Sequence, residues 1–454
     1  MVTERDEGLE AQIGEWRAYV QRRRELTAPD TEELEDHLRD RVEDLRATGL
    51  SADEAFLVAV KRIGSLDAVT REFAQEHSDR LWKQLVLTGA DERVDRDDAR
   101  SDLQSAVFYA VVAALVLKVP PLFGLGMAED FEFYARNLGL FALAPLGAYL
   151  AWRRRLRGAA VATLAAPFVV VAVVVNAFPF DGDSMTLALT AIHAPIALWL
   201  AVGFAYTAGD WRSTLRRMDF IRFTGEWIVY FALIALGGGV LTGLTAGTIA
   251  ALGHDPSVFI GEWLVPCGAA GAVVIAAWLV EEKASVVENM APVLAAVFTP
   301  LFTLALVVLV GSMLLTGGID VDRDALILFD LLLVVVLGLL VYGISARDPL
   351  APVGLLDRMH LVLVLATLVV DVVVLVALAS RIGEFGFSAN KTAALGENLV
   401  LLGNLAWSAR LLVDLVRGRR NADPLQRWQT DYLFVYAAWA WVVIVLFPPV
   451  FGFA

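Results

Sequence analysis

The chain has 454 residues, 57% of them hydrophobic, and a formal net charge of −14. Soluble chains average about 45–50% apolar residues, so the composition argues against a wholly soluble protein. The apolar excess lies almost entirely after position 103, whereas residues 1–100 hold 25 Asp and Glu against 16 Lys and Arg. An acidic segment of this kind does not neutralise phosphates, so direct binding of nucleic acid is not expected.

Cysteine and histidine are scarce in the sequence. Cys267 is the single cysteine and lies inside an apolar run, so an internal disulfide is excluded. The five histidines are scattered, without the spacings typical of zinc sites, and we expect no metal and no cofactor. The chain has neither a phosphate-binding glycine loop nor the residue pattern of a catalytic triad. We therefore expect that it is not an enzyme.

Residues 1–86 show the pattern of four short amphipathic helices. Apolar residues recur every three or four positions, and Ser51 with Glu54 makes a capping box before the third helix. The pattern predicts a small cytoplasmic helical bundle, followed by an acidic linker at 87–103. The expected core residues, helix by helix, are Ile13, Trp16 and Tyr19 or Val20; Leu34, Leu38, Val42 and Leu45; Phe56, Val60 and Ile63; and Leu66, Val69 and Phe73.

One part of this bundle resembles a known domain. An acidic helix is followed by Gly-Leu-Ser at 49–51, then by Glu54 and Ala55, by Arg-Ile-Gly-Ser at 62–65, and by Glu72 with Phe73. Over about residues 10–85 this is similar to the permease prefix domain, a helical signalling domain of bacterial membrane proteins. The resemblance implies that residues 1–86 bind a cytoplasmic protein, such as a winged-helix transcriptional regulator of the PadR type.

Residues 104–454 are predicted to form a polytopic α-helical membrane domain, which makes the whole chain all-α. A membrane span needs about 20 apolar residues, and eleven runs qualify. A count of ten stays open, if one of the Gly-rich or Pro-containing runs is re-entrant. The eleven runs begin near Gln104, Phe131, Gly158, Ser184, Trp227, Val258, Pro292, Ala325, Met359, Thr392 and Thr430.

The basic residues between these runs predict the topology. With the N-terminus in the cytoplasm, the inner loops hold fifteen Lys and Arg, whereas the outer loops hold only Arg323, Arg381 and Lys391. Cytoplasmic loops are enriched in positive charge, so we expect the N-terminus inside and the C-terminus outside, in the lipid bilayer of the bacterial cytoplasmic (inner) membrane.

Several polar residues fall within the predicted spans. Asp371 lies near the middle of the ninth span, and counting from the outer helix ends places Asn404 of the tenth span at the same depth. We therefore predict that these two side chains are neighbours. Two interpretations stay open, interhelical hydrogen bonds or a path for a proton, ion or small polar ligand. The candidate intramembrane cluster is Asp371, Glu397, Asn398, Asn404 and Arg410, with Asp330 and Asp414 as further charges, the latter spaced to pair with Arg410.

Two further motifs have structural interpretations. An outer turn is predicted between the ninth and tenth spans, carrying Arg381, Glu384 and Asn390, with Gly386 and Asn390 suited to a positive φ. In the fifth span, small residues recur every four positions and predict a close helix-packing face. They are Gly239, Gly243 and Gly247.

The C-terminal half resembles a family of bacterial polytopic membrane proteins without an assigned activity. The similarity rests on the Phe-Thr-Pro-Leu turn at 298–301, on the segment from Arg381 to Asn390, and on the closing Trp- and Tyr-rich helix. Two functions are carried forward. The first is a signalling or regulatory membrane protein that acts through a cytoplasmic partner, as a sensor or anchor. The alternative is a transporter or channel that uses the polar residues of the ninth and tenth spans.

Overall fold

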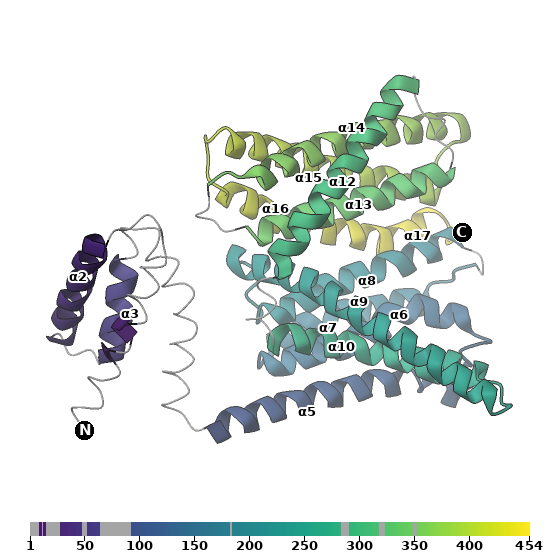
Figure 1. Cartoon of the computed structure of the whole chain (residues 1–454). Coiled ribbons are helices and arrows are strands. Elements are labelled where there is room, and N and C mark those ends of the chain that lie inside the picture. Colours follow the sequence, from purple (N-terminus) through teal and green to yellow (C-terminus); the bar gives the residue numbers. More distant parts are fainter. Residues whose placement is uncertain are drawn as a thin grey trace. The chain divides into compact units, whose positions relative to one another are not determined.

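A computed structural model describes residues 9–10, 12–14, 28–47, 52–63, 92–181, 184–282, 290–316, 323–347 and 352–454. Every regular element in these ranges is a helix, as the expected all-α class requires (Figure 1). The Cα positions divide into two compact units, Met1–Ser101 and Asp102–Ala454. Each unit is described by itself.

The first unit contains two long described helices, α2 (Ala28–Ala47) and α3 (Ala52–Ile63). Their apolar residues face each other as the spacing predicts. Two residues of the predicted first helix also join this core, while the predicted fourth helix lies outside the described residues. The buried core consists of Leu9, Ile13, Leu38, Val42, Leu45, Ala55, Phe56, Ala59 and Val60.

The helix α5 (Glu92–Val116) is continuous across the boundary between the two units. Residues 92–103 of the predicted linker therefore belong to the same helix as the first predicted span. The helical backbone satisfies its own hydrogen bonds, so it can pass from an acidic segment into an apolar one without a break.

Ten helices of the second unit are long and apolar enough to cross a membrane, counted over the described residues. The helix α6 (Phe131–Arg153) is not among the ten, although it lies where the second span is predicted. Its first half contains Glu132, Arg136 and Asn137, which lower its hydropathy. It nevertheless packs along α8 (Met185–Tyr206) and buries Leu146, Tyr149 and Leu150 there.

The remaining helices follow in chain order and carry Figure 1's labels. Two of them contain an internal proline, Pro167 and Pro300, which membrane helices tolerate because neighbouring groups can satisfy the freed backbone carbonyls. The bounds are α7 (Ala159–Ala177), α9 (Thr214–Ala251), the π-helix η2 (Phe259–Leu264) leading into α10 (Val265–Glu282), α12 (Met290–Thr316), α13 (Arg323–Ser345), α14 (Leu355–Phe385), α15 (Ala389–Val416), α16 (Asp423–Trp441), and the C-terminal π-helix η3 (Val442–Leu446) with α17 (Phe447–Val450).

The core of the second unit falls into two main groups of side chains. One joins α5 to α10 and includes Tyr149, Leu198 and Phe220. The other lies among α12 to α16, where Leu363, Val370 and Leu405 are fully buried. The last helices contribute to both groups, since Ile444 belongs to the first and Leu425 to the second.

The prediction that the glycines of the fifth span form a close helix-packing face is wrong within this chain. Gly239, Gly243 and Gly247 are exposed, and a Cβ placed on any of them would meet no atom within 4 Å. The C-terminal part of α9 instead presents an apolar surface that includes Leu236, Val240 and Leu244.

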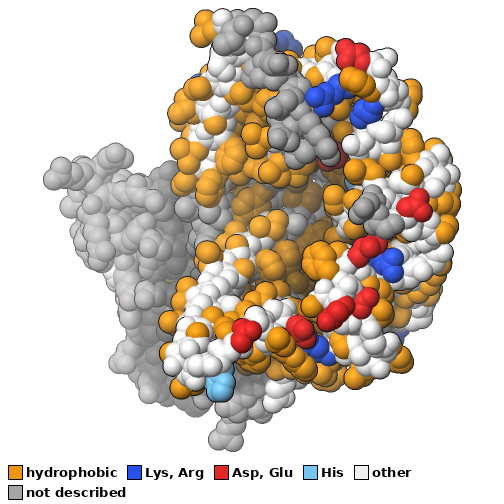
Figure 2. All heavy atoms as spheres, turned by 90° about the vertical axis from the view of Figure 1, so that its right-hand side faces the viewer, with side chains coloured by type: hydrophobic (Ala, Val, Ile, Leu, Met, Phe, Trp, Pro, Cys, Tyr) orange, Lys and Arg blue, Asp and Glu red, His pale blue; other side chains and the backbone are white. Residues whose placement is uncertain are grey.

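Figure 2 views the face that lies to the right in Figure 1. The middle of this face is hollowed and lined mainly by hydrophobic side chains, and acidic side chains lie along one side of the hollow. Surface apolarity of this extent fits helices that lie in lipid rather than in water.

Candidate functional site

The first candidate site is a group of carboxyl and amide side chains between α13, α14 and α15, hereafter the acidic group: Asp330, Asp371, Glu397 and Asn398. Asp371 and Asn398 are fully buried. The amide nitrogen of Asn398 donates a hydrogen bond of 2.9 Å to Asp330 Oδ1. Asp330 is also close enough to interact electrostatically with Asp371 and with Glu397.

Asp371 is the exceptional member of the acidic group. It lies with Val370 and Val374 on the buried face of α14, and its side chain is 0% exposed. Among the described residues, neither of its carboxyl oxygens has a hydrogen-bond partner, and Asn398 Oδ1 is likewise buried without one. Burying a charged carboxylate costs far more than burying the neutral acid, so this site favours the uptake of a proton.

No hydrogen bond joins Asp371 to Asn404, its predicted neighbour, in the described part of the chain. Asn404 donates from Nδ2 to Gln429 Oε1 at 3.1 Å, and its Oδ1 accepts from Ser408 at 3.0 Å. Gln429 Nε2 donates in turn to Ser408 Oγ at 2.7 Å. These three buried residues form a second group, hereafter the amide group, which joins α15 to α16.

The sequence pattern missed Gln429 because the last span was predicted to begin at Thr430. In the structure α16 begins at Asp423, which places Gln429 in the second turn of the helix rather than in a loop. Its side chain is 1% exposed. An amphipathic stretch that starts well before the apolar run was the signal that could have revealed it.

Arg410 does not belong to the predicted cluster. It is exposed on α15, and its guanidinium lies 4.9 Å from the ring centroid of Trp407. The predicted pair with Asp414 is not formed either. Asp414 lies 3.8 Å from Arg419 and 3.9 Å from Arg420, both beyond the end of α15. These contacts fit an interfacial helix end rather than a buried site.

The outer turn is only partly as predicted. Gly386 has a φ of 72°, which is the conformation that favours glycine, and it ends α14. Arg381 and Glu384 lie in the last turns of α14 rather than in the turn. Asn390 is not at a positive φ but in the first turn of α15, where its Oδ1 accepts hydrogen bonds from Ser388 Oγ and the Lys391 backbone.

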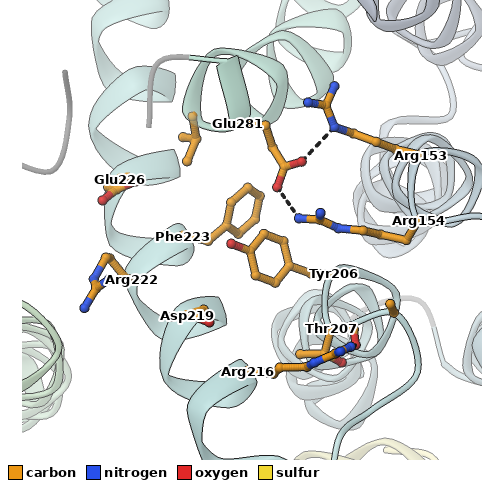
Figure 3. A pocket seen from close by; sticks show the side chains of 12 residues that line it. Arg153, Arg154, Tyr206, Thr207, Arg216, Asp219, Arg222, Phe223, Glu226 and Glu281 are labelled. Carbon is orange, nitrogen blue, oxygen red and sulfur yellow. Dashed lines mark hydrogen bonds and ion pairs between the residues drawn. The ribbon is translucent and has the colours of Figure 1, made fainter. Parts of the chain in front are cut away.

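The second candidate site is a cavity of about 630 Å³ between the ends of α6, α8 and α10 and the start of α9, hereafter the charged cavity (Figure 3). Glu281, whose side chain is 7% exposed, pairs with two arginines of this cavity, with Arg153 Nε at 2.7 Å and Arg154 Nη2 at 2.6 Å. Arg153 also reaches Asp102 of α5 at 3.0 Å. The lining residues are Arg153, Arg154, Tyr206, Thr207, Ala208, Arg216, Asp219, Arg222, Phe223, Glu226, Val280 and Glu281.

The sequence pattern located the arginines of the charged cavity but assigned them only to inner loops. It did not single out Asp219, Glu226 or Glu281. These carboxylates stand near the ends of apolar runs, where acidic residues are common without being functional. Only the arrangement of α9 and α10 shows that they share a space with the arginines.

The described residues contain no group of three His, Cys, Asp or Glu side chains placed to hold a metal ion. Comparison with protein-family models, with curated proteins and with solved structures finds no match to the chain. The functional argument therefore rests on the two sites themselves.

Proposed function

We propose that the chain crosses the bacterial cytoplasmic membrane eleven times, with α6 as the additional span and with the N-terminus inside. Two observations support this. The helix α6 is as long as its neighbours and packs between them, and the arginines at the ends of α6 and α15 follow the positive-inside pattern.

Single-cysteine labelling tests the topology. In a Cys267→Ser background, Ala454→Cys should react with a membrane-impermeant maleimide added to intact cells, whereas Arg419→Cys should react only after lysis. Labelling of Ala454→Cys from the inside alone would contradict the proposal.

Of the two functions considered, transport has the stronger geometric support. We infer that the membrane unit moves protons, alone or together with a small polar solute, through the acidic group. The observation that carries this inference is the fully buried Asp371 carboxyl, which has no hydrogen-bond partner among the described residues and lies within electrostatic range of Asp330. A purely structural polar group in a membrane core is usually satisfied by hydrogen bonds, as the amide group is.

Proton flux into proteoliposomes tests the transport proposal. Vesicles that contain the purified chain and a trapped pH-sensitive dye should acidify when a potassium diffusion potential is imposed. Asp371→Asn keeps the shape of the side chain and should reduce the flux at least tenfold. Asp414→Asn is the matched control, because Asp414 pairs at the helix end and should leave the flux unchanged. Equal proton flux in the wild type and in Asp371→Asn would contradict the proposal. The absence of any proton flux with the wild-type chain would contradict it as well.

The first unit supports a second function, regulation through a cytoplasmic protein. It has its own buried core, and α2 presents a mainly acidic surface for a partner with a basic face. The winged-helix regulator implied by the sequence resemblance is one such partner. Among the α2 side chains whose exposure the structure describes, the exposed charged ones are Asp36, Asp40, Arg41, Glu43, Asp44 and Arg46.

Photo-crosslinking in native membranes tests the regulatory role. A photoreactive amino acid at Asp40 or Glu43 should capture one defined protein. The same amino acid at the exposed Arg419, in the second unit, is the matched control and should not capture it. Identical products from both positions would count against a docking surface on α2.

A further inference from the structure

The charged cavity contains groups of both signs that interactions within the chain leave available. Glu281 is already used by Arg153 and Arg154, and these three side chains form a fixed wall. Three further lining groups are used below, Tyr206 at the end of α8 and Arg216 and Asp219 on α9 (Figure 3).

The wall supplied by α9 offers a free carboxylate. Asp219, Phe223 and Glu226 are spaced by four and three residues, which places them on one face of the helix. Asp219 is half-buried and has no hydrogen bond or ion pair with any described residue. A carboxylate in this setting has unused acceptor capacity for a cationic donor that enters the cavity.

Donors come from the end of α6 and from the first turn of α9. Arg154, just past the end of α6, has a buried Nε that finds no hydrogen-bond partner among the described residues, although its Nη2 is bound to Glu281. Arg216 donates to the Thr207 carbonyl at 2.9 Å and keeps only a loose pair with Asp210 at 3.5 Å. The Tyr206 hydroxyl projects into the cavity and makes no hydrogen bond with the described residues.

We propose that the charged cavity binds a phosphate ester that carries a primary ammonium group, the chemistry of an ethanolamine phospholipid headgroup. The phosphate lies between Arg154 and Arg216 and accepts a hydrogen bond from Tyr206. The ammonium group donates to Asp219. Guanidinium groups suit phosphate oxygens because they present parallel N–H donors, and the carboxylate selects an ammonium that still has protons to donate.

The position of the cavity favours a membrane lipid as the source. It lies where α6, α8 and α10 end and α9 begins, which is the level of the lipid headgroups for helices that span the bilayer. Trp152 and Trp211 lie at the same ends, as expected at a membrane interface. The volume of about 630 Å³ lies within the usual range for small-molecule sites. In the proposed topology the site faces the cytoplasmic leaflet.

Thermal unfolding of the full chain in detergent tests the proposal. Phosphatidylethanolamine should raise the unfolding temperature, and half-saturation should need at least fivefold less of it than of phosphatidylcholine or phosphatidylglycerol. Phosphatidylcholine keeps the charges but cannot donate a hydrogen bond from its quaternary nitrogen, and phosphatidylglycerol has no cation. These two lipids therefore test separately the hydrogen bond and the charge that Asp219 would recognise.

Two variants connect the binding to the cavity. Asp219→Asn and Arg216→Gln should each weaken the effect of phosphatidylethanolamine at least fivefold. The matched controls are Glu282→Gln and Arg212→Gln, which are exposed, lie next to the site in sequence and do not line it. Both controls should retain the wild-type response.

The outcomes separate the sources of the ligand. Competition by soluble phosphoethanolamine supports recognition of the headgroup alone, whereas an effect of the lipid without competition supports a membrane lipid held also by its acyl chains. Equal stabilisation by all three lipids would overturn the proposal. A wild-type response in both Asp219→Asn and Arg216→Gln would overturn it as well. Because these assays do not involve Asp371, failure here leaves the transport proposal standing, and the reverse also holds.

Discussion

Glu281 is expected to be the most sensitive single charge in the second unit. Its carboxylate is 7% exposed and neutralises two guanidinium groups at 2.7 and 2.6 Å. The change Glu281→Gln keeps the shape of the side chain but removes the carboxylate that pairs with both arginines, and of the two, Arg153 keeps a pair with Asp102. Leaving a buried charge without its ion-pair partner lowers the free energy of unfolding by about 3–5 kcal/mol.

The two arginines are 18% and 33% exposed, so water recovers part of that cost. We expect Glu281→Gln to lower the free energy of unfolding by about 2–4 kcal/mol. Arg153→Gln and Arg154→Gln should each cost less, because Glu281 then keeps one partner.

Equilibrium unfolding of the purified chain in mixed SDS micelles, followed by tryptophan fluorescence, measures the difference. Glu282→Gln is the matched control, since its side chain is exposed on the next position of the same helix, and it should stay within about 0.5 kcal/mol of wild type. If Glu281→Gln and Glu282→Gln unfold together, the ion-pair argument is refuted.

Three further predictions concern other contacts. Gln429→Leu should lower stability by about 1–2 kcal/mol in the same unfolding assay, because Asn404 and Ser408 lose buried partners, whereas Gln426→Leu should not. Gly396→Ala should destabilise the chain by about 1–3 kcal/mol, because the added Cβ would overlap the Trp439 ring. Gly243→Ala, where the added Cβ meets open space, should be neutral or slightly stabilising. Equal effects of the two changes would contradict the packing described. In the first unit, the hydrogen bond from Arg39 lowers the pKa of Glu10. The pair of Glu10 with Arg39 therefore contributes fully to folding stability above the ordinary glutamate pKa of about 4.3, and this contribution is lost as the pH falls through the lowered pKa. The protection factors of the α2 amides, which divide out the intrinsic change of exchange rate with pH, should therefore fall at low pH in the whole wild-type chain, and Arg39→Gln should abolish that fall.

Asp371 shows how much of a buried polar group can be predicted from spacing along the sequence. Counting residues placed Asp371 inside a span and on a buried face, and both are confirmed. The same counting predicted Asn404 as its neighbour, but Asn404 forms its hydrogen bonds with Gln429 and Ser408 instead. Depth in the membrane follows from helix rise, but the direction of a side chain around the helix also depends on which neighbours the helix packs against.

The sequence by itself determined the helical class, the positions of the long apolar helices and the core of the first unit. Apolar periodicity is local, so Leu38, Val42, Phe56 and Val60 face inward whatever the rest of the chain does. Tertiary structure alone decided that Glu281 neutralises two arginines, that Gln429 completes the amide group, and that the α9 glycines face outward. Those outcomes depend on contacts between residues far apart in the chain, and no spacing along one helix specifies them.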